Sequence, residues 1–314
     1  MERRDALTDF AARILGVRGR AKLDATAAEV FAAFAAADVD ALLLKGPALA
    51  RMLYTEGESR GYSDVDVLVA PGDLDRARAA LAQAGFADLS EALGIDDVGG
   101  VVHDETWVGP DPEGHQSVDL HLRLPGAAAP AQRVWDALSA RRTAIELAGR
   151  AIPVLRREGL ALHVALHAAQ HGAAHAKGIV DLQLALERWP EAVWRAAAAL
   201  ATEIDAARAF ASGLRQVGDG ARLAERLELA PASAPDARER PRGTFHLQAL
   251  SGARGPRARA RILRRALLPR RAWIVYTYPW ARGGGPLLAA AYAVHLARAP
   301  LWAARAWRYR RTAG

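Results

Sequence analysis

The sequence predicts an α+β fold, with strands and helices over residues 1–157 and a mostly helical domain over residues 158–314. Two observations lead to this prediction. In the first part, short apolar runs with the period of strands alternate with alanine-rich runs of helical period. From Gly159 onward the strand period disappears, and apolar residues recur at helical spacing before a basic, aromatic tail begins at about residue 256.

Individual elements follow from local signals. Val65, Val67 and Val69 alternate along a run that Pro71 stops, which is typical of a strand. The run DLDRARAALAQAGF has helical spacing and ends beside Gly85, a common helix terminator. The expected elements are helix 22–37, strand 39–46, helix 47–57, strand 63–71, helix 73–86, strands 100–108, 116–124 and 151–155, and helices within 160–189 and 191–228.

The N-terminus and the composition bear on location. The first 20 residues carry acids and lack a continuous apolar run, so we expect an amphipathic helix there and no secretory signal. The chain has no cysteine, which excludes disulfides and thiolate metal sites and fits a cytoplasmic protein. Any bound metal must therefore be held by oxygen or imidazole.

Charge is divided unevenly along the chain. The net charge is +7, but residues 1–239 hold 26 Lys and Arg against 35 Asp and Glu, whereas residues 240–314 hold 16 Arg and no acid. Such a division indicates that the C-terminal part meets something anionic. The candidates are the acidic N-terminal part, nucleic acid and a membrane surface.

Three carboxylates are the strongest chemical signal. Asp64 and Asp66 lie two apart on an expected strand, so both should project from one face. Neighbouring carboxylates repel, and a protein keeps such a pair where a divalent cation neutralises it or one is protonated. If the strand carrying Asp119 lies alongside, three oxygen ligands converge on Mg²⁺ or Mn²⁺, as two-metal phosphoryl chemistry requires. The alternative is a solvated strand edge.

A turn upstream is suited to phosphate. Gly46 lets the backbone approach an anion at the start of a helix, and Lys45 could supply a point charge for a triphosphate. Arg60, just before the strand of Asp66, could also reach a phosphate. The alternative for both side chains is an ordinary surface charge.

At this point the sequence resembles a known family. The blocks KGPALARMLY, RGYSDVDVLV, VVHDETWV and SVDLHLRL, in this order, resemble the uncharacterised nucleotidyltransferase family of the polymerase-β-type superfamily. LHAAQHG with GIVDLQLAL resembles the family's helical segment, and ALLPRRAWIVYTYPW resembles its late block, so the resemblance spans about residues 30–300. It implies a mixed sheet flanked by helices, followed by a helical domain.

The resemblance also implies roles for residues. It makes Asp64, Asp66 and Asp119 the catalytic metal ligands, with Asp119 activating the acceptor hydroxyl. Lys45, Gly46 and Arg60 become candidates for triphosphate contact, although the chain has Lys45-Gly46 where the superfamily usually has a Gly-Ser or Gly-Gly pair. His103 and His121 are more weakly implied as residues that line the site. His167 and His171 match the family's helix and are further lining candidates, and Lys177, which follows them, could contact nucleotide or a domain interface.

Histidines recur every four residues from His163 to His175 on one expected helix, so all should face roughly one way. A pair at this spacing can bind a transition metal. The interpretation we prefer is that His167 and His171 face the cleft, with Lys177 and Asp181 following; for Asp181 a structural salt bridge is equally plausible.

The tail beyond Arg254 combines clustered arginines with Trp273, Tyr276, Tyr278 and Trp280. Arginines beside aromatics bind nucleic acid or mark an interfacial helix. We favour a tail that covers the acidic core. The apolar run from Gly285 is broken by His295, Arg298 and Pro300, so we expect no membrane span.

The function predicted is transfer of a nucleoside monophosphate from an NTP to a hydroxyl, with Mg²⁺ or Mn²⁺. Small molecules, peptides and proteins are all candidate acceptors. The family resemblance makes a peptide acceptor in natural-product biosynthesis worth testing. The rival is a catalytically degenerate, antitoxin-like module that binds nucleotide or RNA; intact Asp64, Asp66 and Asp119 weigh against it.

Overall fold

The computed structural model describes residues 20–89, 104–110, 116–172, 175–230, 247, 250–251 and 255–312. The chain divides into two compact units, Met1–Ala87 with His103–Ala237, and Asp88–Val102 with Arg238–Gly314. The expected N-terminal helix lies almost wholly outside the described residues, as does the Pro-, Ala- and Arg-rich segment over residues 230–243, whose composition predicts a linker or exposed loop. The domain boundary at residue 157 stays a prediction.

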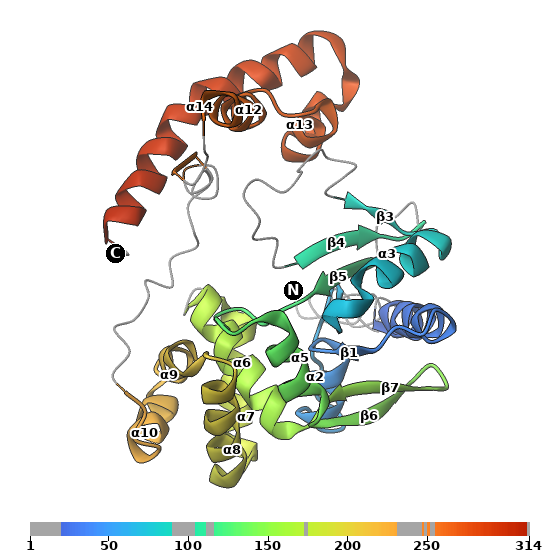
Figure 1. Ribbon diagram of the computed structural model, residues 1–314, viewed down its shortest axis with the longest axis vertical. Helices are drawn as coiled ribbons and strands as arrows, with labels where there is room; N and C mark the ends of the chain where they lie inside the picture. Colours follow the sequence, from blue (N-terminus) through green and yellow to red (C-terminus); the bar gives the residue numbers. More distant parts are fainter. Residues whose placement is uncertain are drawn as a thin grey trace, which may run out of the picture. The chain divides into compact units, whose positions relative to one another are not determined.

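A seven-stranded mixed sheet forms the centre of the first unit (Figure 1). Its order is β3-β4-β5-β2-β1-β7-β6. Strand β2 pairs in parallel with β5, and β1 with β7, whereas β1–β2, β4–β5 and β6–β7 are antiparallel. The strands are β1 Ala41–Leu43, β2 Val65–Val69, β3 Ala87–Asp88, β4 Asp104–Val108, β5 Ser117–His121, β6 Arg142–Leu147 and β7 Arg150–Leu155.

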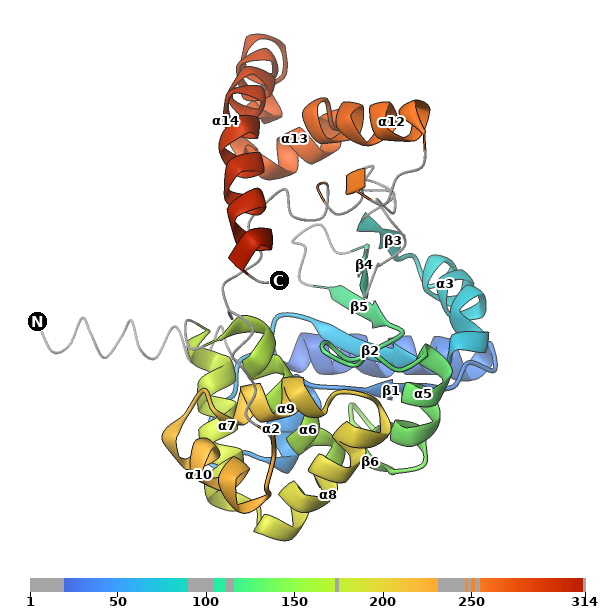
Figure 2. The same cartoon turned by 60° about the vertical axis from the view of Figure 1, so that its left-hand side comes forward.

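Helices follow and flank the sheet, and α6–α10 gather into one group, coloured yellow-green to orange in Figure 2. The α+β class and the mixed sheet flanked by helices are thereby confirmed. Besides the helix over residues 20–36, the helices of this unit are α2 Pro47–Met52, α3 Leu74–Gln83, α5 Ala131–Ser139, α6 Arg157–His171, α7 Ala176–Arg188, α8 Glu191–Glu203, α9 Ala207–Leu214 and α10 Gly218–Arg226.

Strand β6 was missed because its apolar alternation is limited to Ile145 and Leu147, and most of its residues are exposed. It is held by antiparallel pairing with β7 across the tight connection at Ala148 and Gly149, both of which have positive φ. The expected strand 116–124 is shorter than predicted and ends at His121.

One continuous core joins the sheet to the helices. Strand β2 is buried along its whole length, as expected for a central strand, and α6 is buried on most of its sides. Helix α9 approaches α6 so closely that a Cβ on Gly213 would overlap the carbonyl oxygen of Ala165. The helical group is therefore fixed to the same core as the strands that carry the carboxylates.

The helical elements described in the second unit are α12 Pro256–Leu267, α13 Arg271–Thr277, the 3₁₀ turn η2 Pro279–Gly283 and α14 Gly285–Thr312. Its buried core is small: Ile274, Tyr278, Ala281 and Ala291. One segment of α14, Gly285–Arg308, is long and apolar enough to cross a membrane, judged by length and composition alone. Its mean hydropathy is 1.2, and 11% of its most apolar stretch is buried.

The α6–α9 approach yields a prediction about stability. Gly213→Ala should lower the free energy of unfolding by about 3 kcal/mol or more, because the new methyl group meets backbone that cannot move aside alone. Gly218→Ala is the matched control. It lies at the start of α10, where only the far end of Arg222 is near, so stability should hold or rise by up to about 1 kcal/mol. Urea unfolding measures both, and equal effects would contradict the packing described.

Candidate active site

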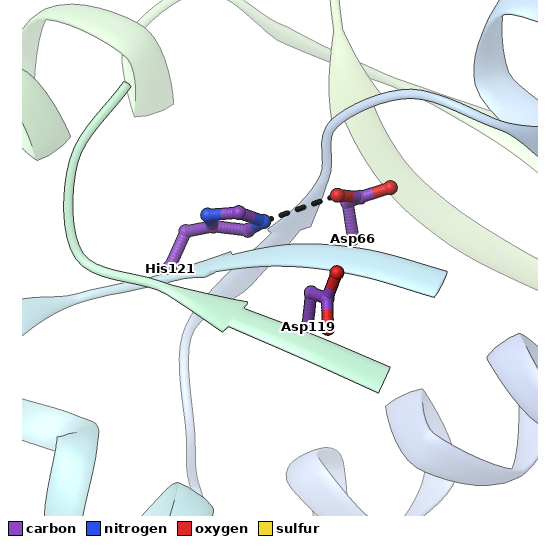
Figure 3. A group of neighbouring side chains, drawn as sticks. All are labelled: Asp66, Asp119 and His121. Carbon is purple, nitrogen blue, oxygen red and sulfur yellow. Dashed lines mark hydrogen bonds and ion pairs between the residues drawn. The ribbon is translucent and has the colours of Figure 1, made fainter. Parts of the chain in front are cut away.

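Parallel pairing of β2 with β5 builds the site. The register places Asp66 directly opposite Asp119 and Leu68 opposite His121. The three polar side chains converge above the strands (Figure 3), and one ligand atom from each lies within 4.8 Å of the others. The register of β2 against β5 thus brings the carboxylates of Asp66 and Asp119 together, as expected for these two residues. The third member of the group is His121, which sequence reasoning had given only a lining role.

Asp66 carries its charge inside the core. The residue is 1% exposed, and its Oδ1 lies 3.0 Å from Nζ of Lys45 and 3.1 Å from Nε2 of His121. Burial alone would raise the pKa of Asp66, but the His121 hydrogen bond and the Lys45 charge outweigh burial and hold that pKa well below its usual range. The other carboxylate oxygen, Oδ2, is buried with no hydrogen-bond partner.

Asp119 differs from Asp66 in its electrostatics. Burial is the largest influence and raises its pKa; the hydroxyl of Thr106, which donates to Oδ1 at 2.8 Å, opposes this, while Asp66 and Asp64 raise the pKa further. Thr106 lies opposite Asp119 on antiparallel strand β4. The fold therefore stabilises the charge of Asp66 and disfavours the charge of Asp119.

Asp64 precedes the strand that carries Asp66. Strand β2 begins at Val65, so the alternation expected of a D-x-D pair on one strand does not fix the direction of Asp64. Asp64 is not in the three-residue group, but it is half-buried, and burial and then Asp66 raise its pKa. Its negative charge acts on Asp66, Asp119 and Lys45 together.

Lys45 and Gly46 lie where β1 leads into α2. The first effect on Lys45 is burial, which lowers its pKa, but Asp66 and then Asp64 raise it overall, so the ammonium stays charged beside the carboxylates. Gly46 has φ +60°, and a Cβ there would come to 3.4 Å from the carbonyl oxygen of Asp64. Glycine thus permits the turn that sets Lys45 against the D-x-D segment.

Arg60 and Asp181 form a buried ion pair. The Arg60 guanidinium donates from Nε to Oδ1 at 2.8 Å and from NH2 to Oδ2 at 2.7 Å of Asp181 on α7. The hydroxyl of Tyr54 donates to Oδ1 at 2.7 Å, and NH1 of Arg60 donates to the carbonyl of Gly46 at 3.4 Å. Arg60 therefore ties α7 to the Lys45–Gly46 turn, and its guanidinium is engaged by protein.

The four histidines lie together but not on one helix as expected: α6 ends at His171, and His175 caps the start of α7, where its Nδ1 accepts from the Gly178 amide at 3.1 Å. The ring centroids of His167, His171 and His175 are 4.6 to 5.1 Å apart, and His163 lies 6.3 Å from His167. Burial lowers the pKa of His163 to about 3 and that of His167 to about 2, so both rings are neutral at pH 7. A small pocket is lined by Lys45, Leu49, Arg60, His163, Val164, His167, Gly178 and Asp181.

The remaining predicted residues fall at the margin. Lys177 is exposed at the start of α7; partial desolvation of its ammonium and then the charge of Arg60 lower its pKa, and Asp64 is the largest influence that raises it. His103 lies outside the described residues. Sequence reasoning missed Thr106 and Tyr54, because a single hydroxyl residue has no local pattern. Thr106 nevertheless lies within the block VVHDETWV that carries part of the family resemblance.

The donor set fits a hard divalent cation. Carboxylate oxygens from Asp66 and Asp119 converge with one imidazole, and the buried, unpartnered Oδ2 of Asp66 is an acceptor that a cation would satisfy. Within the described part of the chain, no other group of three or more His, Asp or Glu brings its ligand atoms this close together. Asp64 lies close enough to add its negative charge to the same site.

The Arg60–Asp181 pair predicts a specific stability pattern. Asp181→Asn should lower the free energy of unfolding by about 3 to 5 kcal/mol, because it leaves a buried guanidinium without its counter-charge. The double variant Arg60→Met with Asp181→Leu removes both charges and should recover much of that loss. Thermal unfolding tests this. A double variant that loses as much stability as Arg60→Met and Asp181→Leu lose in sum would contradict the pairing.

His163 predicts a pH dependence. Its folded pKa lies below the unfolded value, so neutral His163 contributes stability above about pH 6.5, and this is lost as pH falls toward 3. Between pH 7.5 and pH 5, wild type should lose about 2 kcal/mol more stability than His163→Leu, whose side chain cannot bind a proton. Urea unfolding at both pH values gives the double difference, and a difference near zero would show that His163 is not buried as a neutral ring.

Three solved structures are similar to this chain at low sequence identity. The antibiotic-resistance factor ANT(2'')-Ia shares 15% identity at a TM-score of 0.41, over 58% of this chain and 93% of that chain. A nucleotidyltransferase-like protein from Paracoccidioides brasiliensis shares 15% at 0.35, over 61% and 91%. The lincosamide adenylyltransferase LnuA shares 15% at 0.31, over 48% and 89%. No curated protein shows significant sequence similarity to the chain.

The sequence profile of one family matches residues 7–219, which is more than half of the chain. The match includes every strand of the sheet, the three carboxylates and the histidine row. It ends before helices α12 to α14 and before the late block AWIVYTYPW. The family is described as uncharacterised nucleotidyltransferases, and the chain belongs to it.

Proposed function

We propose that the protein transfers a nucleoside monophosphate from an NTP to a hydroxyl group and releases pyrophosphate. The observation that carries the proposal is the pairing of Asp66 with Asp119 across parallel strands, with a buried carboxylate oxygen that has no partner in the protein. Family membership supports the reaction class. The acceptor is a small molecule, a peptide or a protein, and a peptide natural product belongs among the acceptors to be tested.

Asp66, Asp119 and His121 would hold the divalent cation, with Asp64 adding charge. Mg²⁺ or Mn²⁺ bound there would neutralise phosphate charge and lower the pKa of the attacking hydroxyl. Thr106 fixes Asp119 by donating to Oδ1, so Oδ2 is the oxygen that would accept a hydrogen from the acceptor hydroxyl. Asp119 would take up that proton as the cation lowers the pKa of the hydroxyl.

Two lysines would complete the phosphate site. Lys45 is 22% exposed and charged beside Asp66, so its ammonium can move between the carboxylate and an incoming triphosphate oxygen. Lys177 is exposed, and the negative charge of Asp64 reaches it. Arg60 would act indirectly: it bonds Asp181 and the Gly46 carbonyl and so positions the turn that carries Lys45. His167 lines the pocket beside Lys45 as a neutral ring.

Asp119→Asn separates a catalytic from a structural role. Pyrophosphate release with Mg²⁺ should fall at least about a hundredfold, because a ligand and a proton acceptor are lost together. The thermal midpoint without metal should hold or rise, because burial and neighbouring carboxylates disfavour the charge of Asp119 in the fold. The assay follows a mass-shift screen of small-molecule, peptide and protein acceptors with each NTP.

Glu146→Gln is the control, because it removes an exposed carboxylate on β6 and should change neither turnover nor midpoint. Wild-type turnover in Asp119→Asn would refute the role of Asp119. A wild type that binds nucleotide or RNA but releases no pyrophosphate with any acceptor would instead identify the degenerate binding module.

A further inference from the structure

The second unit exposes an unusual amount of apolar surface. Nine large hydrophobic side chains are exposed among the described residues, and eight of them lie between Leu263 and Trp307. They include Trp280 at 47%, Leu301 at 50% and Trp307 at 55% exposure. Apolar side chains gathered in this way on one unit mark a contact surface.

Helix α12 combines this apolar surface with positive charge. Leu263 and Leu267 lie four residues apart and share one face of the helix, and both are exposed. Exposed arginines flank that face: Arg259 on one side and Arg264 on the other. With no acid anywhere in residues 240–314, nothing in this segment neutralises them.

Helix α14 is anchored by one side and exposed on the other. Its inner side carries His295, whose Nε2 lies 2.9 Å from the carbonyl oxygen of Ala266, and Tyr292, whose hydroxyl donates to the carbonyl of Pro269 at 2.9 Å. Leu296 and Leu301 are both exposed and lie about 140° apart around the helix axis, one on each side of that contact. Helix α14 is thus fixed to the end of α12, so a partner meets both helices together.

We propose that this surface, formed by the exposed faces of α12 and α14, binds an anionic lipid membrane, with the helices lying in the interface. A membrane surface offers negative headgroups to the arginines and an apolar interior to the leucines and tryptophans. A span by α14 is disfavoured, because its contacts with the end of α12 would draw the arginines of that helix toward the bilayer.

Other occupants match only half of the surface. The first unit is acidic, but its described residues include one exposed large hydrophobic, Val180, so it lacks an apolar counterpart. A second copy would offer leucines but would set two acid-free arginine clusters against each other. Nucleic acid would satisfy the arginines and leave the apolar side chains in water.

Co-sedimentation of the full chain with vesicles tests this directly. Binding to vesicles of phosphatidylcholine with phosphatidylglycerol should be at least about tenfold tighter than to phosphatidylcholine alone, and should weaken with salt. The variant Arg259→Gln with Arg264→Gln and Arg257→Gln, the last being the exposed arginine next to Arg264 around the helix, should lose at least about tenfold in affinity for the anionic vesicles. Leu296→Gln with Leu301→Gln should also weaken binding, and because both leucines are exposed the fold should survive.

The matched control changes three exposed arginines of the first unit, Arg150→Gln, Arg157→Gln and Arg208→Gln, with the same change in net charge. It should bind anionic vesicles as wild type does. Equal loss in the control and the α12 variant, or no binding to anionic vesicles, would overturn the proposal. So would a dimer in sedimentation velocity that the Leu296 and Leu301 changes dissolve, or native membrane association that resists alkaline extraction.

Discussion

Asp66 lies on the central strand of a buried sheet, and the fold must balance its negative charge there. Two partners do so, Lys45 from the turn after β1 and His121 from the end of β5. Both arrive by backbone pairing: β1 and β5 flank β2 on either side, so the sheet order itself delivers the cation and the imidazole. One oxygen of Asp66 remains without a protein partner, which is what a metal ligand requires.

A second buried ion pair, Arg60 with Asp181, connects helix α7 to the same part of the fold. Arg60 and Asp181 lie 121 residues apart in the chain, yet their side chains form two hydrogen bonds and hold α7 against the Lys45–Gly46 turn. Buried pairs of this kind stabilise a fold weakly but are costly to break, so they fix one geometry. His163 and His167 fit beside this pair as neutral rings, because burial disfavours their charged forms and the charge of Lys45 lowers their pKa further.

Sequence reasoning found the carboxylates because strand period and a β-branched run are local signals. It placed Asp66 and Asp119 on separate strands, and parallel pairing in register brought them together. It could not find that His121 bonds Asp66, or that Arg60 is engaged by Asp181, since both contacts depend on tertiary packing. Asp64 shows the limit of a periodic argument, because the strand begins one residue after it.

Helices α12 to α14 lie beyond the residues that the family profile matches, and their arginines and exposed apolar side chains form a surface separate from the carboxylate site. The central claim concerns the first unit: that Asp66 and Asp119 share a divalent cation. The most direct measurement is an anomalous difference map from crystals soaked in MnCl₂ with a non-hydrolysable NTP analogue. The account predicts a manganese peak between the Asp66 and Asp119 carboxylates, beside His121. A map with manganese bound only at other residues, while nucleotide occupies the site, would contradict it.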